Sequence, residues 1–164
     1  MQNMELTRKK RRIVAWFLFL VYFTILFYFL FFSESLGRGF SEREYQYNLV
    51  PLKEIGRFLK YAHILGKKAV WLNLAGNVIA FMPFGFFLPV FSRRCKKIWY
   101  VLLYSFELSL LVETIQLVTK VGSFDVDDLL LNTIGGVCGY LVYGSLQKIR
   151  RKWNVNKKTQ KKEL

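Results

Sequence analysis

Four long runs of apolar residues alternate with charged segments along this chain. The first, residues 13–32, contains no charge, whereas residues 70–91, 98–118 and 129–146 carry isolated polar side chains. A helix needs about 20 apolar residues to cross a bilayer core of roughly 30 Å. The pattern therefore predicts an all-α, polytopic membrane protein with four transmembrane helices. The polar residues indicate that the last three helices face one another more than lipid.

A cleavable signal peptide is the alternative interpretation of the first run. Such a peptide has a shorter apolar region, of about 7–15 residues, followed by small residues at the cleavage site. Residues 31–40 offer no convincing site of this kind. We therefore favour a retained membrane anchor.

The segment between the first two runs, residues 33–69, contains a helical pattern of its own. Pro51 suits the first turn of a helix. Apolar residues follow it at helical spacing: Leu52, Ile55, Phe58, Leu59, Ala62 and Leu65. We expect an amphipathic helix in this first extracytoplasmic loop, either lying on the membrane surface or capping the bundle. His63, the only histidine, is expected at the surface.

Positive charge orients the predicted bundle. Most of the 25 Lys and Arg residues fall in residues 1–12, 93–97 and 147–164, which four spans place on the same side. The positive-inside rule makes that side cytoplasmic. We thus expect a basic cytoplasmic N-terminus (1–12), a transmembrane domain (13–146) and a basic cytoplasmic tail (147–164). We assign the net charge of +14 to the segments that flank the membrane and not to nucleic-acid binding. The basic runs show neither interleaved aromatic residues nor the pattern of a known nucleic-acid-binding fold.

Polar side chains of the last three runs are expected to meet at one level, near the extracytoplasmic surface. A rise of 1.5 Å per helical residue places those within the spans at depths of roughly 10 Å or less. Spacings of three and four residues put them on shared helix faces. The members of this candidate ligand-binding cluster are Asn73, Asn77, Glu113, Gln116, Asp125, Asp128 and Asn132.

Structural roles stay open for several of these residues. Asp125 can cap the fourth helix, and the amides can form hydrogen bonds between helices. Glu113 is the strongest functional candidate, because a carboxylate within a span is rarely retained without a role. Glu107 points about 120° away from Glu113 and is not expected to join the cluster. Its structural interpretation is a protonated side chain, hydrogen-bonded within the bundle.

Small residues predict close helix contacts. Gly135 and Gly139 have the spacing of a helix-packing motif, and the face with Gly76 and Ala80 can also approach a neighbour closely. Prolines and a glycine in residues 83–89 predict either a kinked or re-entrant segment lining a cavity, or a passive bend.

Three blocks of the sequence carry a family resemblance. NLVPL at residues 48–52, LAGNVIAFMPFGFFLP at 74–89 and ETIQLVTKVGSFDVDDLLLNTIGGVCGY at 113–140 resemble the VanZ-like family in order and spacing. A departure is Gly122, where many relatives carry Arg. The resemblance implies a bacterial cytoplasmic-membrane protein of the cell envelope. It also implies a link to glycopeptide resistance, chiefly to teicoplanin.

Three functions are compatible with these features. The first is a non-enzymatic protein that binds a lipid-linked wall precursor, a lipid headgroup or a lipophilic glycopeptide. The second is an enzyme acting on such a lipid with a divalent cation, whose oxygen ligands would be Asp125, Asp127, Asp128 and Glu113. The third is a transporter or flippase, which four spans could build only as an oligomer. We favour the first, with membrane lipids as partners and no obligatory cofactor.

Overall fold

Helices make up nearly all of residues 2–33 and 45–160, the part of the chain that this computed structural model describes. The elements are α1 (Gln2–Tyr28), the π-helix η1 (Phe29–Ser33), β1 (Tyr47–Asn48), α2 (Lys53–Lys60), α3 (Ala62–Leu65), α4 (Lys67–Phe91), the 3₁₀-helix η3 (Arg94–Lys96), α5 (Ile98–Thr119), β2 (Phe124–Asp125) and α6 (Val126–Gln160). Four stretches within the described residues are long and apolar enough to cross a membrane: Arg12–Phe31, Asn73–Phe91, Ile98–Thr119 and Val126–Lys157. This confirms the predicted all-α, polytopic membrane fold.

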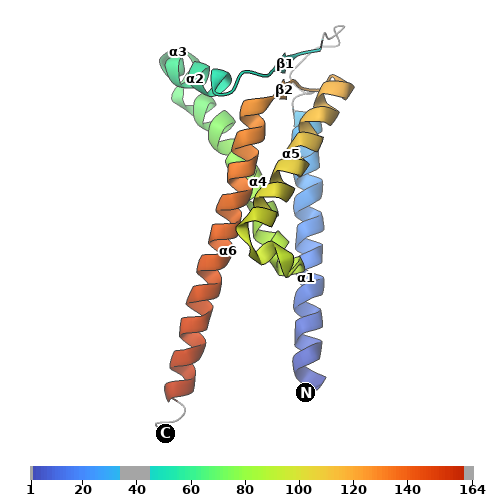
Figure 1. The fold of residues 1–164 in the computed structure, drawn as a ribbon, viewed down its shortest axis with the longest axis vertical. Helices are drawn as coiled ribbons and strands as arrows, with labels where there is room; N and C mark the ends of the chain where they lie inside the picture. Colours follow the sequence, from blue (N-terminus) through green and yellow to red (C-terminus); the bar gives the residue numbers. More distant parts are fainter. Residues whose placement is uncertain (1, 34–44, 161–164) are drawn as a thin grey trace.

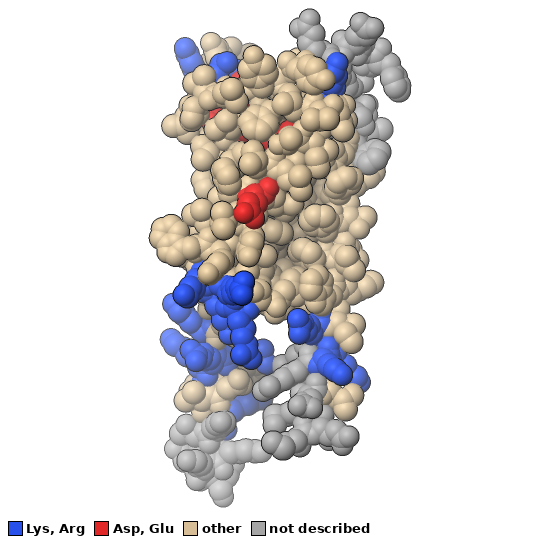
Figure 2. Space-filling model, turned by 45° about the vertical axis from the view of Figure 1, so that its right-hand side comes forward, with Lys and Arg blue, Asp and Glu red and all other residues tan. Residues whose placement is uncertain are grey.

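The four long helices run lengthwise, and the molecule has two distinct ends (Figure 1). At one, the loop end, α2, α3 and the two short strands lie together. At the other, the terminal end, α1 begins and α6 finishes. Figure 2 shows Lys and Arg gathered towards the terminal end, below a broad band with little charge. The described parts of the three basic segments are thus on one side of the apolar band, as four crossings require.

Glycines of α6 set the closest helix contact, the one with α4. A Cβ atom added at Gly139 would lie 1.8 Å from the carbonyl oxygen of Met82, and one at Gly135 would lie 2.2 Å from that of Val78. Both distances are far below van der Waals contact, so only glycine lets the two backbones approach this closely. The packing role predicted for Gly135 and Gly139 is confirmed.

One expectation for α4 is wrong, and one of two alternatives for its prolines is excluded. A Cβ atom at Gly76 would meet nothing within 4 Å, so this glycine does not form a close helix contact. It lines a cavity instead. The helix also runs without interruption through Pro83 and Pro89, so this segment is not re-entrant. The two prolines are accommodated within one helix whose neighbours cover it.

The first span, in α1, lies at the edge of the bundle, because only 6% of its most apolar 18 residues are buried. Aromatic rings join it to α4: Trp16 stacks on Phe91 with ring centroids 4.0 Å apart, and Phe19 meets Phe91 edge-on at 5.2 Å. The Tyr22 hydroxyl donates a hydrogen bond of 2.8 Å to the Ala80 carbonyl. Most of the α1 surface therefore remains for lipid.

The predicted helix of the first loop is present as two short helices, α2 and α3. Leu59 and Ile64 are largely exposed there, and His63 is exposed as expected. The sequence pattern missed the pairing just before α2. β1 pairs in parallel with β2, with Asn48 opposite Asp125, and this joins the first loop to the turn between α5 and α6.

Candidate functional site

A cavity of about 330 Å³ lies near the loop end, among α1, α4, α5 and α6. Its lining residues are Leu26, Phe29, Leu30, Gly76, Asn77, Ala80, Glu113, Gln116, Ser123, Asp128 and Asn132. Five of the seven residues of the predicted polar cluster are among them. The polar groups come from α4, α5, α6 and the turn before β2, whereas α1 and η1 supply an apolar wall. We call this space the loop-end cavity.

Two asparagines join the helices around the loop-end cavity. The Asn77 side-chain amide donates a hydrogen bond to the Asp128 carboxylate, which connects α4 with α6. The Asn132 amide donates to the Ser109 hydroxyl at 3.0 Å, which connects α6 with α5. Asn132 is only 2% exposed, and its carbonyl oxygen Oδ1 has no hydrogen-bond partner among the described residues. A buried acceptor without a donor is costly, so this oxygen is suited to a bound group with an N–H or O–H.

Glu113 and Gln116 hold the neighbouring segments in place. Glu113 is 2% exposed, and its Oε2 atom accepts a hydrogen bond of 2.9 Å from the Asp125 backbone amide. The Gln116 side-chain amide donates at 2.9 Å to the Leu30 carbonyl, which lies in η1. Both side chains thus line the cavity and also connect α5 to its surroundings.

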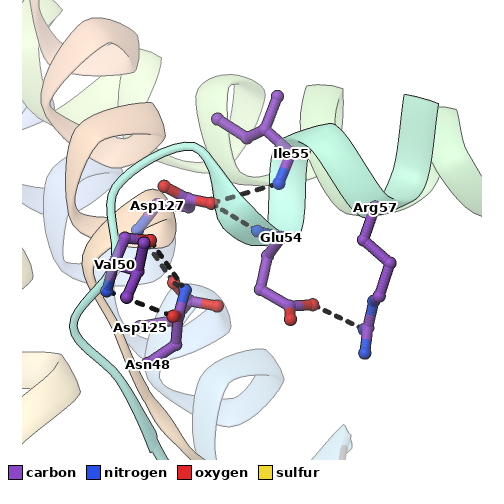
Figure 3. Close-up of polar contacts among 7 residues, drawn as sticks. All are labelled: Asn48, Val50, Glu54, Ile55, Arg57, Asp125 and Asp127. Atoms are coloured by element: carbon purple, nitrogen blue, oxygen red, sulfur yellow. Dashed lines mark hydrogen bonds and ion pairs between the residues drawn. The ribbon is translucent and has the colours of Figure 1, made fainter. Parts of the chain in front are cut away.

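Asp125 lies beside the loop-end cavity and not in its lining. Its Oδ1 atom accepts a hydrogen bond of 2.8 Å from the backbone amide of Asp127, in the first turn of α6. The same atom accepts 3.0 Å from the Asn48 side-chain amide (Figure 3). Such a carboxylate at a helix start satisfies an otherwise unpaired N–H. The capping role left open from the sequence is therefore confirmed.

Asp127 has a role that the sequence pattern did not indicate. Its carboxylate accepts hydrogen bonds from the backbone amides of Leu52, Glu54 at 2.8 Å and Ile55 at 3.1 Å. Figure 3 shows Asp127 beside the first turn of α2. Residue 52, which precedes α2, is a leucine and provides no cap of its own. A carboxylate from α6 thus caps α2, where helix N–H groups favour negative charge.

The remaining predicted residues lie elsewhere. Asn73 is exposed and does not line the loop-end cavity. The four acidic metal candidates do not converge, because no three His, Cys, Asp or Glu side chains of the described residues lie close enough to hold a metal ion. Glu107 is exposed on α5, so the expectation that it would be held within the bundle is wrong. It borders a different groove, next to Phe84 and Cys95.

Some cavity residues were absent from the sequence prediction. Leu26, Phe29 and Leu30 form the apolar wall, and they belong to the first run, whose uniform apolarity marks no particular position. The sequence prediction also missed Ser109, which does not line the cavity but accepts a hydrogen bond from the lining residue Asn132. Ser109 is fully buried and lies on the same face of α5 as Glu113. A search for small polar residues four positions from Glu113 would have found it.

Comparison with known proteins places these features in context. A family model described as VanZ/LLP1 matches residues 19–147. The chain is 32% identical over 111 residues to Protein VanZ of Enterococcus faecium. That match covers 66% of this chain and 59% of the relative, so the chain spans less than two thirds of the relative's length. No solved structure matches.

Proposed function

The chain belongs to the VanZ/LLP1 family, in agreement with the resemblance of its motifs, and from this premise we propose a non-enzymatic role in the bacterial cell envelope. The protein resides in the cytoplasmic membrane and binds an amphipathic ligand in the loop-end cavity. The ligand is a lipid-linked wall component or a lipophilic glycopeptide. Through this binding the protein contributes to teicoplanin resistance.

The distribution of charge supports an orientation with the loop end outside the cell. The described Lys and Arg side chains gather towards the terminal end (Figure 2). Segments rich in Lys and Arg stay on the cytoplasmic side of a membrane. Both termini are therefore cytoplasmic in this proposal, and the loop-end cavity lies at the level of the outer leaflet.

Cysteine labelling tests this orientation. In a Cys95→Ser, Cys138→Ser background, we expect a membrane-impermeant maleimide to label Ser123→Cys in intact cells and Lys97→Cys only after permeabilisation. Both native positions are exposed in the structure. Native Cys95 is not a suitable reporter, because it is 1% exposed and would resist labelling from either side. Labelling of Lys97→Cys in intact cells would reverse the orientation.

The two-sided lining of the loop-end cavity is the observation that carries the proposal. Buried or half-buried amides and carboxylates form one side, and Leu26, Phe29 and Leu30 form the other. A ligand with a polar headgroup and an apolar tail satisfies both sides at once. The space is within the size range of small-ligand sites, at its lower limit of roughly 300 Å³. It therefore suits part of a large amphiphile, such as a headgroup and the first segment of its tail.

The charge of the lining favours a headgroup rich in hydrogen-bond donors. Glu113 and Asp128 are acidic, and no Lys or Arg is among the described lining residues. Ionised carboxylates only accept hydrogen bonds, as does the unpartnered oxygen of Asn132. Hydroxyl, amide or ammonium groups are thus suitable, whereas a phosphate would be repelled. Lys68 and Lys120 are exposed at the loop end, outside the lining, where they could contact a phosphate.

Substitutions in the lining test the proposal by their effect on teicoplanin susceptibility. In a strain made resistant by this protein, we expect Glu113→Gln, Asp128→Asn and Asn132→Ala each to lower the minimal inhibitory concentration at least fourfold. Loss of one hydrogen bond costs about 0.5–1.5 kcal/mol, or about 1.5–3 kcal/mol where a charged group takes part, which allows such an effect. Membrane levels of each variant are measured in parallel.

Matched controls separate the cavity from general damage. Glu107→Gln removes a carboxylate from the same helix as Glu113 but outside the cavity, and Asn73→Ala removes an exposed amide from the helix that carries Asn77. Both controls should retain resistance. Wild-type resistance in all three lining variants at normal membrane levels would overturn the proposed binding site.

A further inference from the structure

A second cavity, of about 770 Å³, lies between α6 and η3, on the side of the molecule towards the terminal end. Its lining residues are Lys96, Tyr140, Leu141, Tyr143, Gly144, Ser145, Gln147, Lys148 and Arg151. We call it the basic cavity. It is far along the helices from the loop-end cavity, and the two share no lining residue.

Three cations converge on the basic cavity from two elements. Lys148 and Arg151 are three residues apart on α6, so they share one helix face. Lys96 comes from η3, and its backbone is held against α6 because the Tyr140 hydroxyl donates a hydrogen bond of 2.6 Å to the Lys96 carbonyl. No Asp or Glu is among the described residues that line this space. The basic cavity is therefore strongly cationic and suited to an anion.

A glycine keeps the basic cavity open. A Cβ atom added at Gly144 would meet nothing within 4 Å, in contrast to Gly139 on the same helix. Helix packing thus does not require glycine at position 144, and the missing side chain leaves space in the lining. Beside it, the Gln147 amide donates a hydrogen bond of 3.2 Å to the Tyr143 hydroxyl.

The basic cavity lies where the apolar band meets the basic segments. Lys96 precedes the first residue of α5 by two positions, and Lys148 and Arg151 follow the apolar part of α6. Leu141, which is 55% exposed, lies on the side towards the apolar band. Tyrosines are typical of the level of lipid headgroups, and two are present here. A lipid bound here would place its anionic group at Lys96, Lys148 and Arg151 and its acyl chain beside Leu141.

We propose that the basic cavity binds the headgroup of an anionic phospholipid of the leaflet at the terminal end. The phosphodiester contacts Lys96, Lys148 and Arg151, the hydroxyl groups of the headgroup contact Ser145 and Gln147, and an acyl chain runs along Leu141. A free phosphate shares the first of these contacts. The apolar edge and the position of the cavity favour the lipid.

Native mass spectrometry of the full-length protein tests this inference. We expect dioleoylphosphatidylglycerol to bind at least tenfold more tightly than dioleoylphosphatidylcholine. The triple variant Lys96→Gln, Lys148→Gln, Arg151→Gln should lose this preference, because each cation near a membrane surface adds to the attraction for anionic lipid. The control variant Lys97→Gln, Arg150→Gln, Lys152→Gln removes the same charge from neighbouring positions outside the lining and should keep it. Equal losses in the two variants would indicate diffuse attraction and overturn the site.

A variant that changes shape without charge provides an independent test. The Cβ atom of Gly144→Leu would meet nothing within 4 Å, and the rest of the side chain would occupy space in the basic cavity. We expect this variant to bind phosphatidylglycerol at least fivefold more weakly, with folding checked by its melting temperature. Unchanged binding in this variant would contradict the proposal. Excess inorganic phosphate should not displace the lipid, and displacement by this excess would assign the cavity to a free anion.

Discussion

Replacing Gly139 with alanine is expected to disrupt the contact between α4 and α6. The added Cβ atom would lie 1.8 Å from the Met82 carbonyl oxygen and 2.9 Å from the Phe86 amide nitrogen. Both atoms belong to the backbone, so no side-chain rotation can relieve the overlap and the two helices must separate. We expect a loss of stability in the upper part of the roughly 1–3 kcal/mol range of overpacked cores.

Gly144→Ala is the matched control for this experiment. It adds the same methyl group to the same helix at a position where nothing lies within 4 Å. Because alanine favours helix by up to about 1 kcal/mol over glycine, this variant should be at least as stable as the wild type. Thermal unfolding in detergent, followed by size-exclusion chromatography, compares the two. Equal melting temperatures for the two variants would show that the close approach is not required.

Replacing Asp127 with alanine is expected to release α2 and α3 from the loop end. The change leaves the backbone amides of Leu52, Glu54 and Ile55 without the carboxylate that accepts from them. Hydrogen bonds to a charged group contribute about 1.5–3 kcal/mol each, and water replaces only part of this. Amide hydrogen exchange over residues 52–65 should accelerate at least tenfold, while the spans keep their protection.

Two further variants give this result its meaning. Asp127→Asn retains an acceptor oxygen without the charge and should have an intermediate effect. Glu54→Gln removes a carboxylate that pairs with Arg57, with 2.5 Å between its Oε2 atom and the Arg57 Nη2 atom. The Arg57 side chain is 55% exposed, and such a surface pair contributes at most about 1 kcal/mol. If Glu54→Gln accelerates exchange as much as Asp127→Ala does, the carboxylate of Asp127 is not the main attachment of α2.

The membrane spans could be predicted because about 20 consecutive apolar residues are rare outside transmembrane helices. The predicted limits of the second and third runs, 70–91 and 98–118, lie close to α4 and α5. The fourth run, 129–146, covers only part of α6, which extends from Val126 to Gln160. An apolar run predicts only the part of a helix that lies in the membrane. Helix α6 continues beyond that part because residues such as Lys and Arg have high helix propensity.

The level of the candidate site could also be predicted, but its membership could not. Counting residues along a helix gives depth, and this placed Asn77, Glu113 and Asn132 together near one end. Depth does not say how far a cavity extends along a helix face. Asn73 lies one turn from Asn77 on the same face of α4, yet it is exposed and outside the cavity lining. The partner of Asp127 is a helix start more than 70 positions away, and no local pattern contains that information.

The length of α6 has a practical consequence for attaching other molecules to this protein. At 1.5 Å per residue, the helix reaches on the order of 20 Å beyond a bilayer core of about 30 Å. A helical partner joined in frame to this segment would be held at a defined distance and angle. Each inserted residue would turn that partner by about 100° and move it 1.5 Å further out. The number of residues added to this helix would thus set both the distance and the rotation of a fused domain.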